Sequence, residues 1–138
     1  KRMDMHYVEK ARQLRSKGYN CAQAVACSFS EVVGLDEQVL FSMMEGFGGG
    51  MGGHQATCGA LSGAVAIAGL VTSKGSVEGQ TKALTYAKSK ALVQAFEARC
   101  KSLVCKDLLG EETGVELHSC ELCVEDAVLL VQEMLQNR

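Results

Sequence analysis

The sequence has no proline and no tryptophan, and aromatic residues make up only 5% of its 138 residues. Chains dominated by sheets and long loops usually contain proline, so its absence favours helices joined by short turns. The scarcity of aromatic side chains weakens any stacking platform for nucleic-acid bases. The net charge of −2 also shows no excess of basic residues that could bind phosphate groups, so we expect no nucleic-acid partner.

Long apolar runs are also missing. The longest weakly polar stretch, Ala60 to Val71, falls short of the roughly 20 residues that span a bilayer, so we expect no membrane insertion. Residues 1–20 are polar and amphipathic without the apolar core of a signal peptide, which predicts a cytoplasmic protein. A leader removed ahead of Lys1 would leave the same sequence.

Apolar residues recur at helical spacing along most of the chain, and no convincing alternating strand is present. The length predicts a single domain over residues 1–138 with its own core. We predict an all-α bundle of about six helices with a glycine-rich loop between the third and the fourth. The predicted helices cover residues 4–17, 21–33, 37–45, about 57–71, 77–99 and from about 120 onward, with Asn20 and Asp36 as caps and a short helical turn near 105–110.

The predicted loop is unusually rich in glycine, because six of the eight residues from Gly46 to Gly53 are glycine. Glycine lets backbone amides approach an anion or a cofactor closely. No Gly-Lys-Ser/Thr ending follows, which excludes a nucleoside-triphosphate loop, and no βαβ unit supports a dinucleotide fold. A hairpin between two crowded helices is the structural alternative. The candidate cofactor-binding residues are Gly48, Gly49, Gly50, Gly52 and Gly53.

Cysteine is abundant, and the seven cysteines are Cys21, Cys27, Cys58, Cys100, Cys105, Cys120 and Cys123. An odd number without a signal peptide argues against a secreted disulfide framework, and in a reducing compartment excess cysteine indicates metal binding or redox chemistry. The alternative is that cysteine serves as a small buried hydrophobe. Cys27 and Cys100 lie within predicted helices, and core packing explains them most simply.

Cys58 is placed for reactivity. If it lies in the first turn of the fourth predicted helix, free backbone amides and the helix dipole there favour thiolate over thiol. His54 precedes it by four residues, so helical geometry would put both on one side, as a Cys/His metal pair or as a histidine that lowers the thiol pKa. A solvated histidine is the alternative.

Cys120 and Cys123 form a CxxC motif near the start of the last predicted helix, a spacing that suits a redox dithiol or half of a metal site. Valine follows Cys123 where haem attachment needs histidine, so no covalent haem is expected. Cys100 and Cys105 are too widely spaced for a zinc knuckle. His118 is a further candidate ligand, with a surface side chain as the alternative.

The cysteine-bearing segments together resemble the C_GCAxxG_C_C family, to which redox activity is attributed because of its cysteines. The resemblance runs from about Gly18 to Leu130. The segments that carry it are "GYNCAQAV", "GFGGGMG" with "TCGALSGAV", "FEARCKSLVCKDLLG" and "CELCVEDAV". One departure is that Thr57, not glycine, precedes Cys58, and Gly59 follows it. The family cysteines fall on Cys21, Cys58, Cys105 and either Cys120 or Cys123.

These observations predict a small helical redox protein, as an oxidoreductase or an electron-transfer protein acting with a redox partner or a small molecule. We expect Cys21, Cys58, Cys105 and Cys120 to converge, and to cycle between dithiol and disulfide or to hold an iron–sulfur cluster or zinc. Thiol–disulfide chemistry is slightly favoured. As metal ligands, Cys123 and His54 join the same four cysteines.

Two other classes of function stay open. One is a non-enzymatic helical binding module whose glycine-rich loop holds a small molecule or cofactor. The other is an oligomeric structural protein, such as a homodimer, whose small-residue helices pack across the subunit interface.

Overall fold

The computed structural model describes residues 5–137, and these residues are all-helical apart from turns and one isolated bridge between Thr57 and Val104. They form eight α-helices and three short helical turns. The α-helices are α1 (His6–Ser16), α2 (Cys21–Cys27), α3 (Ser30–Val33), α4 (Glu37–Met44), α5 (Gly59–Thr72), α6 (Lys82–Cys100), α7 (Cys105–Leu109) and α8 (Cys120–Gln136). The short turns are η1 (Glu45–Phe47), η2 (Gly50–His54) and η3 (Val77–Gly79).

The all-α prediction is confirmed, but the count of about six helices is not. The predicted helix over 21–33 is interrupted at Phe29, whose φ of −108° and ψ of 16° lie outside helical values, and this separates α2 from α3. The predicted turn near 105–110 is a short helix, α7. The first predicted helix extended to Asp4, which lies outside the described residues.

Local capping explains where the helices begin and end. Asn20 caps α2 through a reciprocal pair of hydrogen bonds with Gln23, at 2.8 and 2.9 Å. Asp36 and Ser119 cap α4 and α8 through their side-chain oxygens. Gly34, with a φ of 68°, closes α3 in the left-handed conformation. The caps at α2 and α8 set the positions of two cysteines described below.

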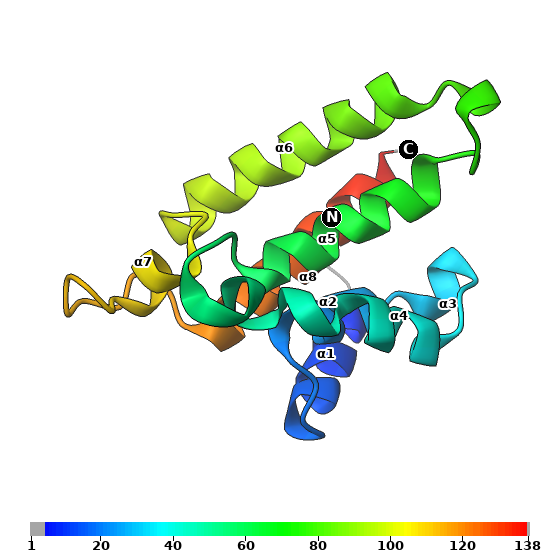
Figure 1. Ribbon diagram of the computed structural model, residues 1–138. Coiled ribbons are helices and arrows are strands. Elements are labelled where there is room, and N and C mark those ends of the chain that lie inside the picture. Colours follow the sequence, from blue (N-terminus) through cyan, green and yellow to red (C-terminus); the bar gives the residue numbers. More distant parts are fainter. Residues whose placement is uncertain (1–4, 138) are drawn as a thin grey trace.

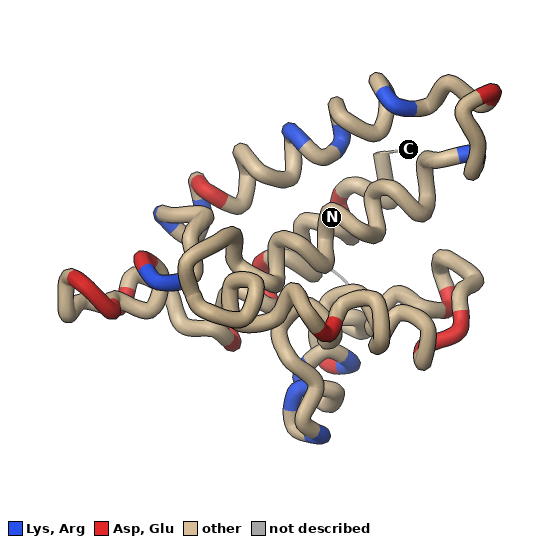
Figure 2. Tube along the Cα trace, in the orientation of Figure 1, with Lys and Arg blue, Asp and Glu red and all other residues tan. Residues whose placement is uncertain are grey.

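Helix α5 lies at the centre of the bundle and packs against α2, α6 and α8 (Figure 1). It carries no charged residue, whereas Lys, Arg, Asp and Glu lie on the elements around it (Figure 2). Its small residues permit close packing: an ideal Cβ on Gly63 would lie 2.7 Å from the carbonyl oxygen of Ala22 in α2. Helix α2 therefore occupies the space where a side chain on Gly63 would project.

The glycine-rich segment is folded rather than an open loop, so the predicted form of this loop is not confirmed. It forms η1 and η2, and it packs against α7 at one end of the bundle (Figure 1). Several of its residues adopt positive φ, including the non-glycine residues Met51 and His54. Glycine tolerates this conformation at no steric cost, and the glycines around Met51 therefore allow the chain to reverse within a few residues.

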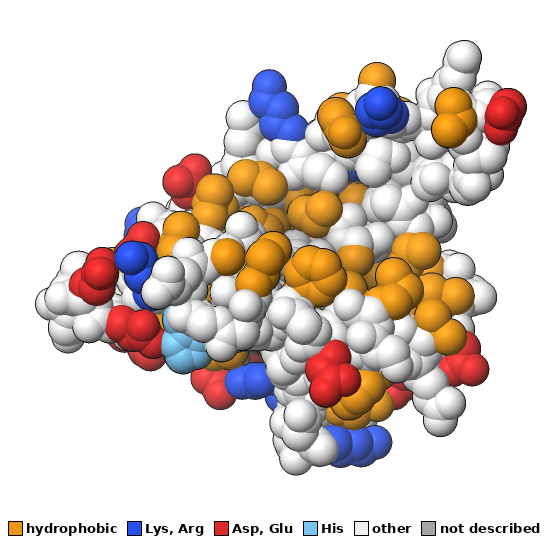
Figure 3. Space-filling view, viewed as in Figure 1, with side chains coloured by type: hydrophobic (Ala, Val, Ile, Leu, Met, Phe, Trp, Pro, Cys, Tyr) orange, Lys and Arg blue, Asp and Glu red, His pale blue; other side chains and the backbone are white. Residues whose placement is uncertain are grey.

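The surface carries scattered apolar side chains over α4, α5 and α6 (Figure 3). Val39, Met43, Phe47 and Met51, spaced four residues apart, are each more than a third exposed. Among the helices of residues 5–137, none is both long enough and apolar enough to cross a membrane. The homodimer expected from the sequence stays a prediction.

Candidate functional site

One cavity of about 280 Å³ brings together most of the cysteines. Five of the seven line its wall, together with Arg15, His54 and His118. The five are Cys21, Cys58, Cys105, Cys120 and Cys123. They come from α2, α7 and α8 and from the residue preceding α5, so the fold assembles segments spread over about a hundred residues, as the sequence predicted.

Each of the four cysteines taken from the family pattern lies at the start of a helix. Cys21, Cys105 and Cys120 are the first residues of α2, α7 and α8, and Cys58 is the N-cap of α5. Backbone N–H groups at a helix start have no partner within the helix, so they are free to stabilise a thiolate. Such groups lower the pKa of Cys21 and Cys58, whereas other causes keep the pKa of Cys105 and Cys120 raised.

The isolated bridge links the two segments that carry Cys58 and Cys105. The backbone N–H of Cys58 donates to the carbonyl of Leu103 at 2.7 Å, and the N–H of Cys105 donates to the carbonyl of Ala56 at 3.0 Å. These two bonds tie the segment before α5 to the segment before α7. Both thiols consequently face the same cavity.

Cys21 and Cys120 form a hydrogen-bonded thiol pair. The hydrogen bond from Cys120 lowers the pKa of Cys21 to about 6, assisted by backbone N–H groups of Gly49 and Ala22 and by the charge of Arg15, against the opposing effect of burial. The same hydrogen bond, together with burial, raises the pKa of Cys120. Nη2 of Arg15 lies 3.5 Å from Sγ of Cys120. At neutral pH the pair therefore holds one thiolate and one thiol.

Cys58 and Cys123 form a second pair deeper in the protein, with exposed fractions of 5% and 1%. The hydrogen bond from Cys123 lowers the pKa of Cys58, and backbone N–H groups of Ala60 and Leu61 add to this effect. The pKa of Cys123 is raised by its hydrogen bonds to Cys100 and Cys58 and by burial. As in the first pair, one thiol has a lowered pKa and the other has a raised pKa.

Cys105 is a protonated thiol on the same wall. Burial raises its pKa to about 11, and the negative charges of Cys58 and Cys21 add to the shift. Gly50 packs directly on it, since an ideal Cβ there would lie 2.5 Å from Cβ of Cys105. A glycine is needed at this position both for that contact and for its φ of 60°.

These shifts predict that stability rises with pH from about 6 to about 9 and falls above that range. Within it the native chain holds a thiolate at Cys21, and the lowered pKa of Cys58 acts in the same direction, whereas the unfolded chain keeps both thiols protonated near their ordinary pKa of 9.0. The unfolded state then binds more protons, so the free energy of unfolding increases by up to about 1.4 kcal/mol per pH unit for each proton. At higher pH the sign reverses, because Cys27 and Cys105 stay protonated in the native state up to a pKa of about 11.

Urea denaturation of the reduced protein across this pH range measures the effect. The Cys21→Ser variant should lose part of the rise below pH 9. The Cys27→Ser variant should keep that rise and lose part of the fall above pH 9. A wild-type stability that stays flat between about pH 6 and about pH 9 would contradict the assignment of native thiolates.

The glycines expected to bind a cofactor differ in position. Of the five, only Gly49 lies in the cavity wall. Gly48 packs against the side chain of Asn20, while Gly52 and Gly53 have open space where a side chain would project. The structure therefore does not bring Gly48, Gly52 or Gly53 to the cavity, and Gly50 contacts it only through Cys105.

His54 lines the cavity, but not by the geometry expected from the sequence. Its φ of 65° lies outside the helical range, so it does not share a helical face with Cys58. Its Nδ1 pairs with the carboxylate of Glu111 at the protein surface. That pairing anchors η2 to the turn that follows α7.

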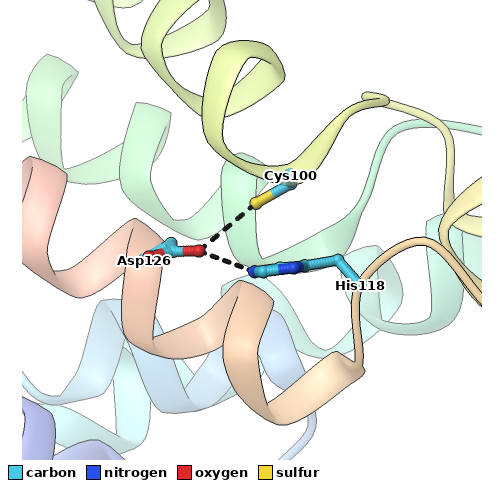
Figure 4. A group of neighbouring side chains, drawn as sticks. All are labelled: Cys100, His118 and Asp126. Atoms are coloured by element: carbon cyan, nitrogen blue, oxygen red, sulfur yellow. Dashed lines mark hydrogen bonds and ion pairs between the residues drawn. The ribbon is translucent and has the colours of Figure 1, made fainter.

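A polar cluster beside the cavity is made of Cys100, His118 and Asp126, of which sequence reasoning identified only His118 as a candidate ligand (Figure 4). Cys100 had been interpreted as core packing, and it is fully buried, but it hydrogen-bonds both Asp126 and Cys123. A signal was present in α8, because Cys120, Cys123 and Asp126 recur every third residue and so share a helix face. Arg15 was also missed, since nothing local marks it as facing a thiol.

Cys27 behaves as predicted for a structural cysteine. It is fully buried, its thiol donates to the backbone carbonyl of Glu37, and burial raises its pKa to about 11. It is absent from the cavity wall, which makes it a useful control.

Comparison with known families places this cysteine arrangement in context. Residues 19–134 match the family model described as "Putative redox-active protein (C_GCAxxG_C_C)". No curated protein and no solved structure is detectably similar to the chain. The matched region contains all five cavity cysteines and covers most of the sequence. The chain therefore belongs to the C_GCAxxG_C_C family.

Proposed function

We propose that this protein is a thiol-based oxidoreductase in which Cys21 and Cys120 cycle between a dithiol and a disulfide. The observation that carries the proposal is that both cysteines line one cavity, where the interaction with Cys120 lowers the pKa of Cys21 to about 6 and the same interaction raises the pKa of Cys120. One sulfur is ready to attack and the other is held beside it. Membership of a family described as redox-active supports the same conclusion.

The reaction begins when the Cys21 thiolate attacks one sulfur of a small disulfide, R–S–S–R′. The substrate S–S bond breaks, R′S⁻ leaves, and a mixed disulfide forms on Cys21. Cys120 then gives up its proton and attacks the Cys21 sulfur, which forms the Cys21–Cys120 disulfide and releases RS⁻. The substrate gains two electrons and leaves as two thiols, with one proton from Cys120 and one from solvent.

The burial of the site favours a small substrate over a folded protein. Cys21 is only 5% exposed, and the cavity volume of about 280 Å³ lies near the lower end of the range for small-molecule sites. Arg15 lines the same cavity, and its positive charge, which also pairs with Glu121 at 3.6 Å, favours an anionic group on the substrate. We therefore infer an anionic disulfide of low molecular weight.

The test is anaerobic titration of the reduced protein with an anionic small disulfide such as oxidised glutathione. We expect two thiols to be lost per chain first, and peptide mapping to identify a Cys21–Cys120 disulfide. Cys58 and Cys123 should react later, because Cys123 is only 1% exposed whereas Cys120 is partly exposed. The Cys27→Ser control should behave like the wild type. An unchanged thiol count would contradict the proposal and favour a binding module.

A thiolate-bound iron–sulfur cluster is the second candidate, favoured by the five thiols around one cavity. Among residues 5–137, no three of these sulfurs lie within 4.8 Å of one another, so they are too widely spaced for a single zinc ion. Of the ligands predicted from the sequence, Cys21, Cys58, Cys105 and Cys120 would hold such a cluster. Iron and sulfide analysis of anaerobically prepared protein distinguishes the two candidates, since bound cluster would protect these thiols from the disulfide.

A further inference from the structure

Three side chains beside the cavity converge as metal ligands do (Figure 4). Sγ of Cys100, a ring nitrogen of His118 and a carboxylate oxygen of Asp126 all lie within 4.8 Å of one another. Nε2 of His118 lies 2.7 Å from Oδ2 of Asp126, and Sγ of Cys100 lies 3.6 Å from the same oxygen. The end of α6 and the region around the start of α8 therefore direct their polar atoms at one point.

We propose that Cys100, His118 and Asp126 form a zinc site that is separate from the redox pair. Thiolate, imidazole and carboxylate are the three ligand types that Zn²⁺ takes in proteins. Bond lengths of about 2.0–2.3 Å and tetrahedral angles require ligand atoms about 3.3–3.8 Å apart. The 2.7 Å separation between His118 and Asp126 must therefore lengthen, and the widest separation, at most 4.8 Å, must shorten by no more than about 1.5 Å.

The surroundings suit a divalent ion. Cys100 is fully buried, and the side chains of His118 and Asp126 are only 19% and 22% exposed. A thiolate and a carboxylate neutralise two positive charges, which offsets the cost of burying the ion. Nη1 of Arg99 lies 3.7 Å from Oδ1 of Asp126, so it orients the carboxylate from behind and leaves Oδ2 for the metal.

Zinc binding exchanges protons for the ion. Cys100 must lose its thiol proton, which is released to solvent as the S–Zn bond forms. His118 must bind as the neutral ring with its proton on Nδ1, so that the Nε2 lone pair replaces the present contact with Asp126. Asp126 binds as the carboxylate.

The site lies next to the redox cavity. His118 lines that cavity, and Cys100 hydrogen-bonds Cys123, the partner of Cys58. Three protein ligands leave a fourth coordination position for water, which is the pattern of an open zinc site. The ion would cross-link the end of α6, the segment before α8, and α8 itself.

The experiment measures zinc bound by the full reduced chain. Metal-free protein is equilibrated with Zn²⁺, passed through gel filtration and analysed for zinc; we expect one ion per chain. His118→Gln and Asp126→Asn change side chains that are partly exposed, so they should fold, and each should weaken zinc binding by at least about 100-fold. Cys27→Ser and the Cys21→Ser/Cys120→Ser double variant should retain zinc.

Cobalt substitution provides a second readout. The Co²⁺-loaded wild type should show a thiolate-to-cobalt charge-transfer band, and Cys100→Ser should lose this band while the double cavity variant keeps it. Zinc retained at full affinity in both His118→Gln and Asp126→Asn would overturn the proposal. So would zinc lost only from the double cavity variant, which would place the metal among the cavity thiols.

Discussion

Resolution of the mixed disulfide on Cys21 is expected to fail in the Cys120→Ser variant. Cys21 keeps its place in this variant, and the serine hydroxyl can still donate a hydrogen bond to its sulfur. The first attack on a small disulfide should therefore proceed, whereas no thiol remains next to Cys21 to release the second half of the substrate. The protein should accumulate with the small thiol attached, which intact-mass measurement detects.

Removing Cys120 should slow the release of the second half of the substrate far more than the lowered pKa of Cys21 speeds the first attack. Lowering the pKa of Cys21 from 9.0 to about 6 raises the thiolate fraction at pH 7 from about 1% to about 90%. Nucleophilicity falls about 20-fold over the same shift, which leaves a net gain of only about fourfold. A well-oriented intramolecular group, by contrast, reaches effective concentrations of about 10⁵ M or more. Even with imperfect orientation, the mixed disulfide should persist on the order of 10³ times longer than in the wild type.

Two further variants make this prediction specific. Cys21→Ser should form little mixed disulfide at neutral pH, because it lacks the proposed attacking thiolate and burial still raises the pKa of Cys120. Cys27→Ser should resolve at the wild-type rate. If Cys120→Ser also resolves at that rate, another cavity thiol is the partner of Cys21, and the proposed pairing is wrong.

The helix boundaries were predictable because capping acts over a few residues. The starts at Asn20 and Asp36 and the end at Gly34 depend on side chains and φ angles close to the boundary itself. The break at Phe29 was not predictable in the same way. Ser28, Phe29 and Ser30 have intermediate helix propensity, and neither glycine nor proline marks the break.

The convergence of the cysteines was predictable from their family pattern, but their pairing was not. Cys120 and Cys123 are close in the sequence, yet each hydrogen-bonds a thiol from another helix. Contacts of this kind depend on how α2, α5 and α8 cross, which no local spacing encodes. For the same reason a fully buried cysteine, Cys100, was taken as core packing although it faces a carboxylate.

The second prediction concerns Gly59, the residue that follows Cys58. The Gly59→Ala variant should be less stable than the wild type. An ideal Cβ on Gly59 would lie 2.5 Å from Sγ of Cys21 and 2.8 Å from the carbonyl oxygen of Phe47. The sulfur can turn away, but the backbone of η1 cannot move without disturbing its neighbours. Overpacking of this kind costs about 1–3 kcal/mol.

The same substitution should also weaken the thiolate at Cys21. Displacing its sulfur would lengthen the hydrogen bonds from Cys120 and from the backbone of Gly49, which are the contacts that lower its pKa. We expect the pKa of Cys21 to rise from about 6 toward its ordinary value. Titration of the thiolate by its ultraviolet absorbance measures this shift, and urea denaturation measures the stability.

Gly69→Ala is the matched control, because Gly69 lies in the same helix with nothing within 4 Å of an ideal Cβ. There the added methyl group meets no neighbour, and alanine should stabilise the helix by about 0.8–1.0 kcal/mol. The two variants should therefore differ in unfolding free energy by about 2–4 kcal/mol, with opposite signs. Equal changes in unfolding free energy in the two variants would mean that Gly59 is not needed to leave space for Cys21 and Phe47. A cost confined to Gly59, accompanied by a raised Cys21 pKa, would mean that this glycine is small because a reactive sulfur occupies the space of its missing side chain.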